Sequence, residues 1–164
     1  MTKRARVPMT KSEQMARVRS KDTAAEVRLR RALWQAGLRY RLHPGIPGTP
    51  DVAFVGARVA VFVDGCFWHG CPEHYTSPAK NADFWAIKLR RNATRDRDVD
   101  AALAAAGWAS VRVWEHELRD PEGVVTRVRA ALALRRRGLS ASRADDAIDI
   151  VLGHEPDGPK VEGA

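Results

Sequence analysis

Residues 51–64, which read DVAFVGARVAVFVD, are the stretch that decides the fold. The segments at residues 51–55 and 58–63 each begin with a charged residue, are otherwise apolar and flank a short glycine–alanine turn; runs rich in valine and phenylalanine favour strands. The stretch therefore predicts a β-hairpin whose second strand is buried. Asp51 begins the first segment and Asp64 directly follows the second, so the two carboxylates could converge at one end of a sheet.

Apolar periodicity extends this pattern on both sides of the hairpin. Thr23 and Glu26 have the spacing of a capping box, which predicts a helix from there to Gly37. Further helices are predicted over residues 12–19, 83–106 and 124–137, and further strands over residues 38–42 and 108–114. The result is an α/β fold with the order helix, three strands, helix, strand, followed by a C-terminal helix. Residues 65–80 show no periodic pattern of apolar residues.

Charge divides the chain into unequal parts. Residues 1–137 carry 26 Lys and Arg against 14 Asp and Glu, a net charge of +12, whereas residues 138–164 carry 2 against 6, a net charge of −4. We expect a flexible basic arm at residues 1–11, one folded domain at residues 12–137, and an acidic disordered tail at residues 138–164. The basic domain favours binding of a polyanion such as nucleic acid.

Composition also bears on where the protein acts. The chain has no run of eighteen apolar residues, and its first residues lack the apolar stretch of a signal peptide, so we expect a cytoplasmic protein. Both of its cysteines, Cys66 and Cys71, fall within six residues of each other. In a reducing compartment such a pair binds metal more often than it forms a disulfide.

The irregular segment after the hairpin contains candidate zinc ligands. Cys66, Cys71 and His74 lie within nine residues, and His116 follows the predicted strand at residues 108–114. Two cysteines and two histidines suit tetrahedral Zn²⁺, and ligation would supply the order that the segment lacks. The alternative is a pair of buried thiols with two ordinary surface histidines. His116 is the least secure of the four ligands.

The two hairpin carboxylates indicate phosphodiester hydrolysis. A carboxylate can hold Mg²⁺, which offsets charge that builds up on phosphate. Asp51 and Asp64 could equally be solvated loop carboxylates, so this pattern alone does not settle the chemistry.

Longer motifs make the interpretation specific. Residues 61–74 read VFVDGCFWHGCPEH, and FWxxKxxxNxxxDRD follows at residues 84–98, with Gly107-Trp108 and Val113-Trp-Glu115 behind it. In this order the motifs resemble the very short patch repair (Vsr) endonucleases, over about residues 10–135. The resemblance implies a restriction-endonuclease-like core and a Mg²⁺-dependent enzyme that nicks one strand of double-stranded DNA 5′ to the T of a T:G mismatch. It also implies a functional link to a cytosine-5 methyltransferase and to mismatch repair. We expect a monomer.

The resemblance assigns roles to several residues. Asp51 and the backbone carbonyl of Val63 would hold Mg²⁺, His69 would transfer the proton, and Asp96 would support His69. Glu26 would lie near the metal, although its capping-box interpretation is nearly as good. Asp64 departs from family members that carry histidine there, and His116 departs from members that carry cysteine.

The predicted helix at residues 83–106 has one face that changes along its length. Lys88, Asn92 and Asp96 share a face with Val99 and Leu103, so we expect the apolar half to dock on the sheet and the polar half to lie beside the scissile phosphate. Arg90 and Arg91 are expected to contact phosphates.

The aromatic residues divide into two groups. By resemblance, Phe67, Trp68 and Trp85 would insert beside the mismatch, where unstacking costs least; the alternative is that all three are core aromatics. For the remaining tryptophans, Trp34, Trp108 and Trp114, we expect core packing.

Two other functions stay open on the sequence alone. One is a restriction-type or defence nuclease that cuts matched DNA, and the other is a non-catalytic, zinc-braced DNA-binding module. A comparison of paired duplexes that differ only in T:G against C:G distinguishes the first from a mismatch enzyme, and the absence of any cleavage identifies the second.

Overall fold

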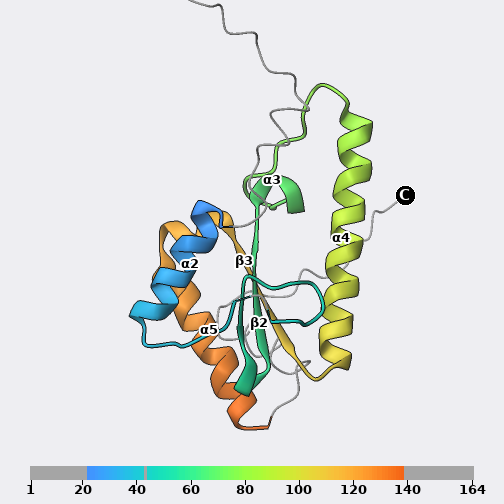
Figure 1. Ribbon diagram of the computed structural model, residues 1–164. Helices are drawn as coiled ribbons and strands as arrows, with labels where there is room; N and C mark the ends of the chain where they lie inside the picture. Colours follow the sequence, from blue (N-terminus) through green and yellow to red (C-terminus); the bar gives the residue numbers. More distant parts are fainter. Residues whose placement is uncertain (1–21, 43, 139–164) are drawn as a thin grey trace, which may run out of the picture.

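The computed structural model describes residues 22–42 and 44–138 and has the predicted α/β class. A small sheet lies between two helical layers, with helices α2 (Ala24–Gln35) and α5 (Pro121–Arg136) on one side and helix α4 (Ala82–Ala105) on the other (Figure 1). The predicted basic arm, the helix at residues 12–19 and the acidic tail beyond Gly138 lie outside the described residues. Among the described helices, none has the length and apolar character needed to span a membrane.

The sheet is mixed and has the order β1-β2-β3. Strands β1 (Val52–Phe54) and β2 (Val59–Asp64) form the predicted antiparallel hairpin, joined by the 3-10 turn η1 (Val55–Ala57). Strand β3 (Ala109–Trp114) pairs parallel with β2, in a register that sets Asp64 opposite Trp114. Because β2 and β3 are parallel, the segments that follow both strands leave from the same edge of the sheet.

The prediction of a strand at residues 38–42 is wrong. The segment is reduced to an isolated bridge, in which the Arg41 N–H donates to the Ala53 carbonyl at 2.8 Å and the Ala53 N–H donates to the Arg41 carbonyl at 2.9 Å. Strand β1 ends at Phe54 and the chain enters the η1 turn at Val55, so residue 39, the next position that could hydrogen-bond in this ladder, has no strand partner. The sheet therefore has two named strands before α4 and not three.

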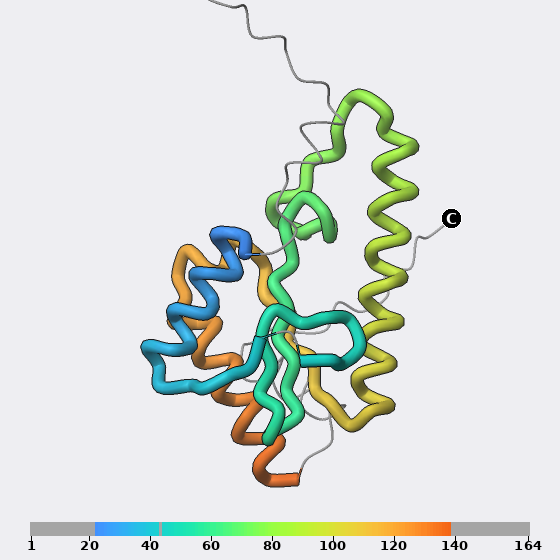
Figure 2. Tube along the Cα trace, in the orientation of Figure 1, coloured from blue at the N-terminus to red at the C-terminus, as the bar shows by residue number. Residues whose placement is uncertain are grey.

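The segment at residues 65–80 contains a short helix that the sequence did not predict, α3 (Cys66–His69). Gly70 ends it in the left-handed region, with φ of 70°. A Cβ at this position would lie 2.8 Å from Leu89 Cδ1, so a glycine is needed where α3 approaches α4. Figure 2 shows α3 beside the N-terminal half of α4, beyond the edge of the sheet.

Helix boundaries follow their capping residues. The Thr23 side chain accepts from the Glu26 N–H at the start of α2, which confirms the predicted cap. Helix α5 begins at Pro121, earlier than predicted, because the Asp120 side chain caps it and proline is well suited to the first turn.

Apolar side chains fill both faces of the sheet. Residues of all three strands pack with α2 and α5 on one face, and Ala60 and Phe62 pack with Leu103 and Val99 of α4 on the other. The apolar half of the α4 face therefore docks on the sheet as predicted. Buried side chains of this kind contribute about 1.5–3 kcal/mol each.

The remaining tryptophans do not share one environment. Trp108 packs against the α4 side of the core, and Trp114 is half-buried. Core packing is wrong for Trp34, which is 57% exposed and carries the Arg39 guanidinium 3.8 Å above its ring. A cation–π contact at an exposed site covers part of the ring without burying it.

Candidate active site and metal centre

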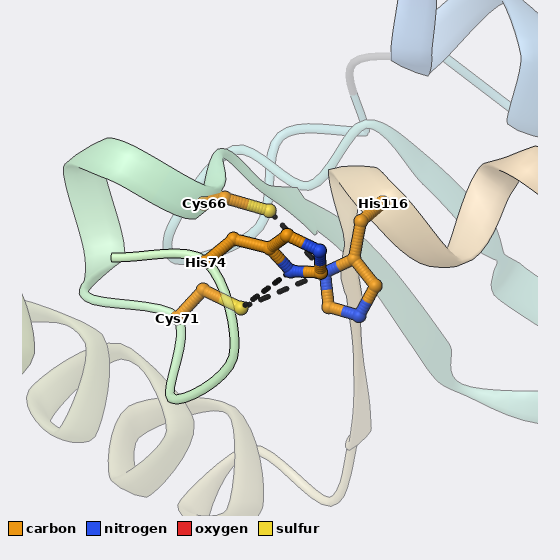
Figure 3. A group of neighbouring side chains, drawn as sticks. All are labelled: Cys66, Cys71, His74 and His116. Atoms are coloured by element: carbon orange, nitrogen blue, oxygen red, sulfur yellow. Dashed lines mark hydrogen bonds between the residues drawn. The ribbon is translucent and has the colours of Figure 1, made fainter. Parts of the chain in front are cut away.

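The four candidate zinc ligands come together beyond the edge of the sheet. Cys66 lies on α3, Cys71 and His74 lie in the loop after it, and His116 lies on the 3-10 turn η2 (Glu115–Arg119) that follows β3. Their ligand atoms all lie within 4.8 Å of one another, and Figure 3 shows the sulfurs and imidazoles turned toward a common centre. The predicted pairing of the Cys66–His74 segment with His116 is therefore present in space.

The separations fit a tetrahedral cation. His116 Nδ1 lies 3.3 Å from Cys66 Sγ and 3.5 Å from Cys71 Sγ, and His74 Nδ1 lies 3.7 Å from Cys71 Sγ. Zinc–ligand bonds of about 2.0–2.3 Å set sulfur and nitrogen about 3.5 Å apart at the edge of a tetrahedron. The cluster could thus hold a metal ion.

The surroundings of the cluster orient its ligands. His116 presents Nδ1 to the thiols, and its Nε2 lies 3.5 Å from Glu73 Oε2. A carboxylate on the second ring nitrogen fixes the tautomer of a ligating histidine. Burial, together with the neighbouring Cys71 thiol, raises the pKa of Cys66. The sequence did not single out Glu73, which stands next to His74 and could have been noticed for that reason.

Asp51 lies at the same end of the sheet, immediately before β1. Its Oδ2 accepts the Val63 N–H at 2.7 Å, which ties the carboxylate to strand β2. Burial raises the pKa of Asp51 to about 6; the Val63 N–H opposes this shift, and the Glu26 carboxylate adds to it. A mostly buried carboxylate with a raised pKa is a group whose charge a cation would stabilise.

His69, at the end of α3, contacts two carboxylates. Its Nδ1 lies 2.6 Å from Asp96 Oδ2 of α4 and 3.6 Å from Asp64 Oδ1 of β2. Because Nδ1 of His69 is bonded to Asp96, the second ring nitrogen, Nε2, is left to exchange a proton. Asn92, one turn before Asp96, donates from Nδ2 to the Trp68 carbonyl at 2.7 Å and fixes α3 to α4.

Asp64 forms an ion pair that the sequence did not predict. Its two oxygens each lie 3.0 Å from one terminal nitrogen of Arg112 on β3. The same guanidinium donates to Asp100 Oδ2 at 2.9 Å and to the Asp96 carbonyl at 3.2 Å. Arg112 therefore offsets the Asp64 charge and anchors α4 to the sheet. A charged residue in the middle of an otherwise apolar strand was the available signal.

Glu26 is 6% exposed and makes its contacts around the start of α2. Its carboxylate accepts from the Asp22 N–H at 2.8 Å, the Thr23 hydroxyl at 2.9 Å and the Arg30 guanidinium at 2.9 Å. It also lies near enough to Asp51 to raise the pKa of that carboxyl. The Thr23 half of the predicted capping box is thus present, whereas the Glu26 carboxylate accepts the N–H of Asp22, one residue before the cap. Arg30 is a further charged neighbour of the site that the sequence did not indicate.

The predicted wedge residues form one aromatic cluster. Phe67 lies edge-on to Trp68 at 5.2 Å and to Trp85 at 5.0 Å between ring centroids, and Tyr75 adds a fourth ring 6.1 Å from Phe67. Phe67 is 37% exposed, whereas Trp68 and Trp85 are half-buried. The cluster therefore lies on the surface between α3 and α4 and not in either core cluster. Tyr75 was missed because it follows the zinc candidate His74 without a motif of its own.

Basic side chains border this aromatic surface. Lys88 Nζ lies 5.1 Å from the centroid of the Trp68 ring and 5.9 Å from that of Trp85. Arg90 and Arg91 are exposed on α4. Lys88 and Asn92 thus lie on the same polar half of the α4 face as Asp96, in the predicted arrangement. Aromatic rings beside cations are typical of a nucleic-acid contact surface.

Comparison with known proteins identifies the class of enzyme to which this chain belongs. The family profile "DNA mismatch endonuclease Vsr" matches residues 5–74. A "Type II nicking enzyme V.NaeI" from Lentzea aerocolonigenes is 47% identical over 113 residues, which cover 65% of this chain and 68% of that protein. The chain is therefore a DNA endonuclease, a hydrolase, and the non-catalytic alternative is excluded.

Two further relatives span more of their own length. A "Type II nicking enzyme V.XorIIP" from Xanthomonas oryzae pv. oryzae is 42% identical over 120 residues, covering 72% of this chain and 88% of that protein. The "DNA mismatch endonuclease Vsr" of Escherichia coli K12 is 36% identical over 115 residues, covering 69% and 74%. The chain belongs to the Vsr family of DNA nicking endonucleases.

Proposed function

We propose that this endonuclease nicks one strand of double-stranded DNA 5′ to the T of a T:G mismatch and depends on Mg²⁺. One observation carries the proposal: the His69–Asp96 pair, at 2.6 Å, lies on the same two helices as the exposed aromatic cluster. A group that moves protons is thereby fixed next to a surface that can stack on bases. Family membership supports the nicking reaction, and the aromatic surface supports recognition of a distorted base pair.

In the proposed mechanism, Asp51 and the Val63 carbonyl would hold Mg²⁺, and the Val63 N–H orients Asp51. Magnesium supplies a Lewis acid that offsets the charge that develops on the phosphate. His69 takes a proton at Nε2 from the attacking water while Asp96 holds Nδ1. The water oxygen forms a bond to phosphorus, the bond to the leaving sugar oxygen breaks with its electron pair on that oxygen, and a proton from solvent completes the sugar hydroxyl. Asp64 and Glu26 act indirectly. Asp64 pairs with Arg112, and the Glu26 carboxylate raises the pKa of Asp51.

The proposed metal of the Cys66, Cys71, His74 and His116 cluster is structural Zn²⁺. Two thiols and two imidazoles favour zinc over magnesium, which prefers oxygen ligands. Ligation would fix α3 to η2 and so hold both His69 and Phe67 in place. We also infer that the layered core is of the restriction-endonuclease type, which is consistent with the family.

The proposed substrate fixes the expected partners. T:G pairs arise when 5-methylcytosine is deaminated, so we expect the enzyme to work beside a cytosine-5 methyltransferase and mismatch repair. We expect a monomer that acts in the cytoplasm, where the DNA is accessible.

Mismatch recognition is tested by the double variant Phe67→Ala/Trp68→Ala. The measurement is the ratio of single-turnover nicking rates on T:G and C:G duplexes. Loss of the stacking contact, worth about 1–3 kcal/mol per base, should lower the ratio by roughly tenfold or more. Trp34→Ala, an exposed tryptophan on α2, is the matched control and should leave the ratio unchanged. An unchanged ratio in the double variant would mean that Phe67 and Trp68 are packing residues and that mismatch recognition lies elsewhere, whereas a wild-type ratio near one would favour the nuclease that cuts matched DNA.

A further inference from the structure

A second groove lies at the other end of the sheet from the candidate active site. It has a volume of about 560 Å³ and is formed by the η1 turn, the segment after α2 and the last turns of α5. Strand β2 begins beside η1 and ends at Asp64, so about 17 Å of strand separates the groove from the catalytic residues. Its volume is in the range of ligand-binding pockets.

The groove is strongly basic. Its lining includes Arg39, Arg58, Arg135 and Arg136 and contains no carboxylate. None of the four forms an ion pair with an Asp or Glu of residues 22–42 and 44–138. Arg135 is held in place by the carbonyls of Ala57 and Gly107. The groove therefore presents fixed positive charge that no described acidic group neutralises.

The floor of the same groove is apolar. Leu38, Phe54, Val55 and Leu132 contribute to its lining, and Val55 is 46% exposed. A DNA backbone would pair with the guanidinium groups and leave this apolar floor uncovered. The lining instead fits a peptide segment that combines carboxylates with aliphatic side chains.

The chain itself supplies a segment of that chemistry. Residues 144–152 read ADDAIDIVL, with three aspartates and four large aliphatic side chains. They belong to the acidic part of the chain, residues 138–164, whose net charge is −4. Residues 144–152, which follow helix α5 in the chain, thus combine the negative charge and the aliphatic side chains that a basic groove with an apolar floor would bind.

The length of the connection permits contact. Helix α5 ends at Arg136, itself in the lining, and residue 144 follows seven residues after Arg137. Seven residues span up to about 24 Å when extended, and the connection starts at a helix end that itself lines the groove. A short tether of this kind gives an effective concentration in the millimolar range, so weak contacts suffice for occupancy.

We propose that residues 144–152 dock in this groove of the same chain, with their aspartates on the four arginines and their aliphatic side chains on the floor. Docking keeps these arginines from binding DNA phosphates and confines phosphate contacts to the side of the molecule with the active site. Release of the segment adds a second cationic surface, although the formal net charge of the chain stays +8.

The test uses the full chain with Val55 replaced by the photo-crosslinker p-benzoylphenylalanine. Irradiation at low protein concentration, followed by mass spectrometry of peptides, should give an intramolecular adduct to residues 144–152 whose yield falls as salt is added. Ile87, 47% exposed on α4, is the matched control position and should not react with that segment. An adduct from position 55 to a second copy of the chain would overturn the proposal, and so would the absence of any peptide adduct.

A charge-conserving variant provides the second test. In Ile148→Ser/Ile150→Ser the adduct should fall by about tenfold or more, because two aliphatic contacts are lost, while Val161→Ser should leave it unchanged. The released variant should also bind matched duplex more tightly, with a steeper dependence on salt, and nick at the wild-type rate in saturating single-turnover assays. An adduct that survives the double substitution would contradict the docking mode.

Discussion

Asp51→Asn should separate stability from activity. The carboxyl is mostly buried, and burial raises its pKa from 3.8 to about 6. The folded protein thus holds the Asp51 proton more tightly than the unfolded chain does. The stability that this proton contributes is fully present below about pH 4 and is lost as the pH rises through 6. Asparagine carries no charge and can still accept the Val63 N–H.

The expected gain follows from that shift. A difference of about two pKa units corresponds to about 3 kcal/mol, and partial exposure of the site reduces it to about 2 kcal/mol. We therefore expect Asp51→Asn, without added magnesium, to have a higher free energy of unfolding than the wild type at pH 8 and an equal one below pH 4. Nicking should fall to background, since the proposed metal ligand is lost, while DNA affinity is largely retained.

Urea unfolding from pH 4 to pH 8 measures this gain, with nicking assayed in parallel. Asp98→Asn, an exposed carboxylate on the same α4 helix as Asp96, is the control and should change neither property. Magnesium should stabilise the wild type and not Asp51→Asn, because a ligand raises stability only where it binds. Near-wild-type nicking by Asp51→Asn, or an unfolding free energy below that of the wild type at pH 8, would refute the reasoning.

Three further predictions concern the surrounding residues. Elemental analysis should find one zinc per chain; Cys71→Ala should lose it and unfold more readily, while His116→Cys should keep it because thiolate is also a zinc ligand. Arg112→Met should lower the free energy of unfolding by about 2–4 kcal/mol in urea titrations, since Asp64 is left buried without its partner, and adding Asp64→Asn should recover most of that loss. Arg90→Ala should weaken binding to all duplexes alike and reduce the salt dependence by about one phosphate contact, measured by titration at several salt concentrations.

The parts of the fold that the sequence predicted are those with a strong local pattern. The 51–64 hairpin has uninterrupted apolar runs, and the long α4 helix has a continuous face from Lys88 to Leu103. Apolar and polar residues alternate at residues 38–42 as in a strand, yet pairing there depends on how far the neighbouring strand extends. Strand β1 gives way to the η1 turn at Val55, and the pairing is reduced to one bridge at Arg41.

The candidate site shows a similar division. The cluster of Cys66, Cys71, His74 and His116 was predictable because ligand chemistry identifies its members even across forty residues of chain. Arg112 was not, because its partners Asp64 and Asp100 become neighbours only when α4 lies across β3. The prediction of core packing was wrong for Trp34, because the position of a tryptophan on a helix does not show whether another layer covers it.

The most direct test of the account is single-turnover nicking by the wild-type protein on two otherwise identical duplexes, one with a T:G pair and one with C:G. The reaction contains Mg²⁺, and both strands carry different end labels. We expect one nick, 5′ to the mismatched T, on the T:G duplex alone and no cleavage when magnesium is removed. Equal cleavage of both duplexes, or cutting of both strands, would contradict the proposed mismatch nickase.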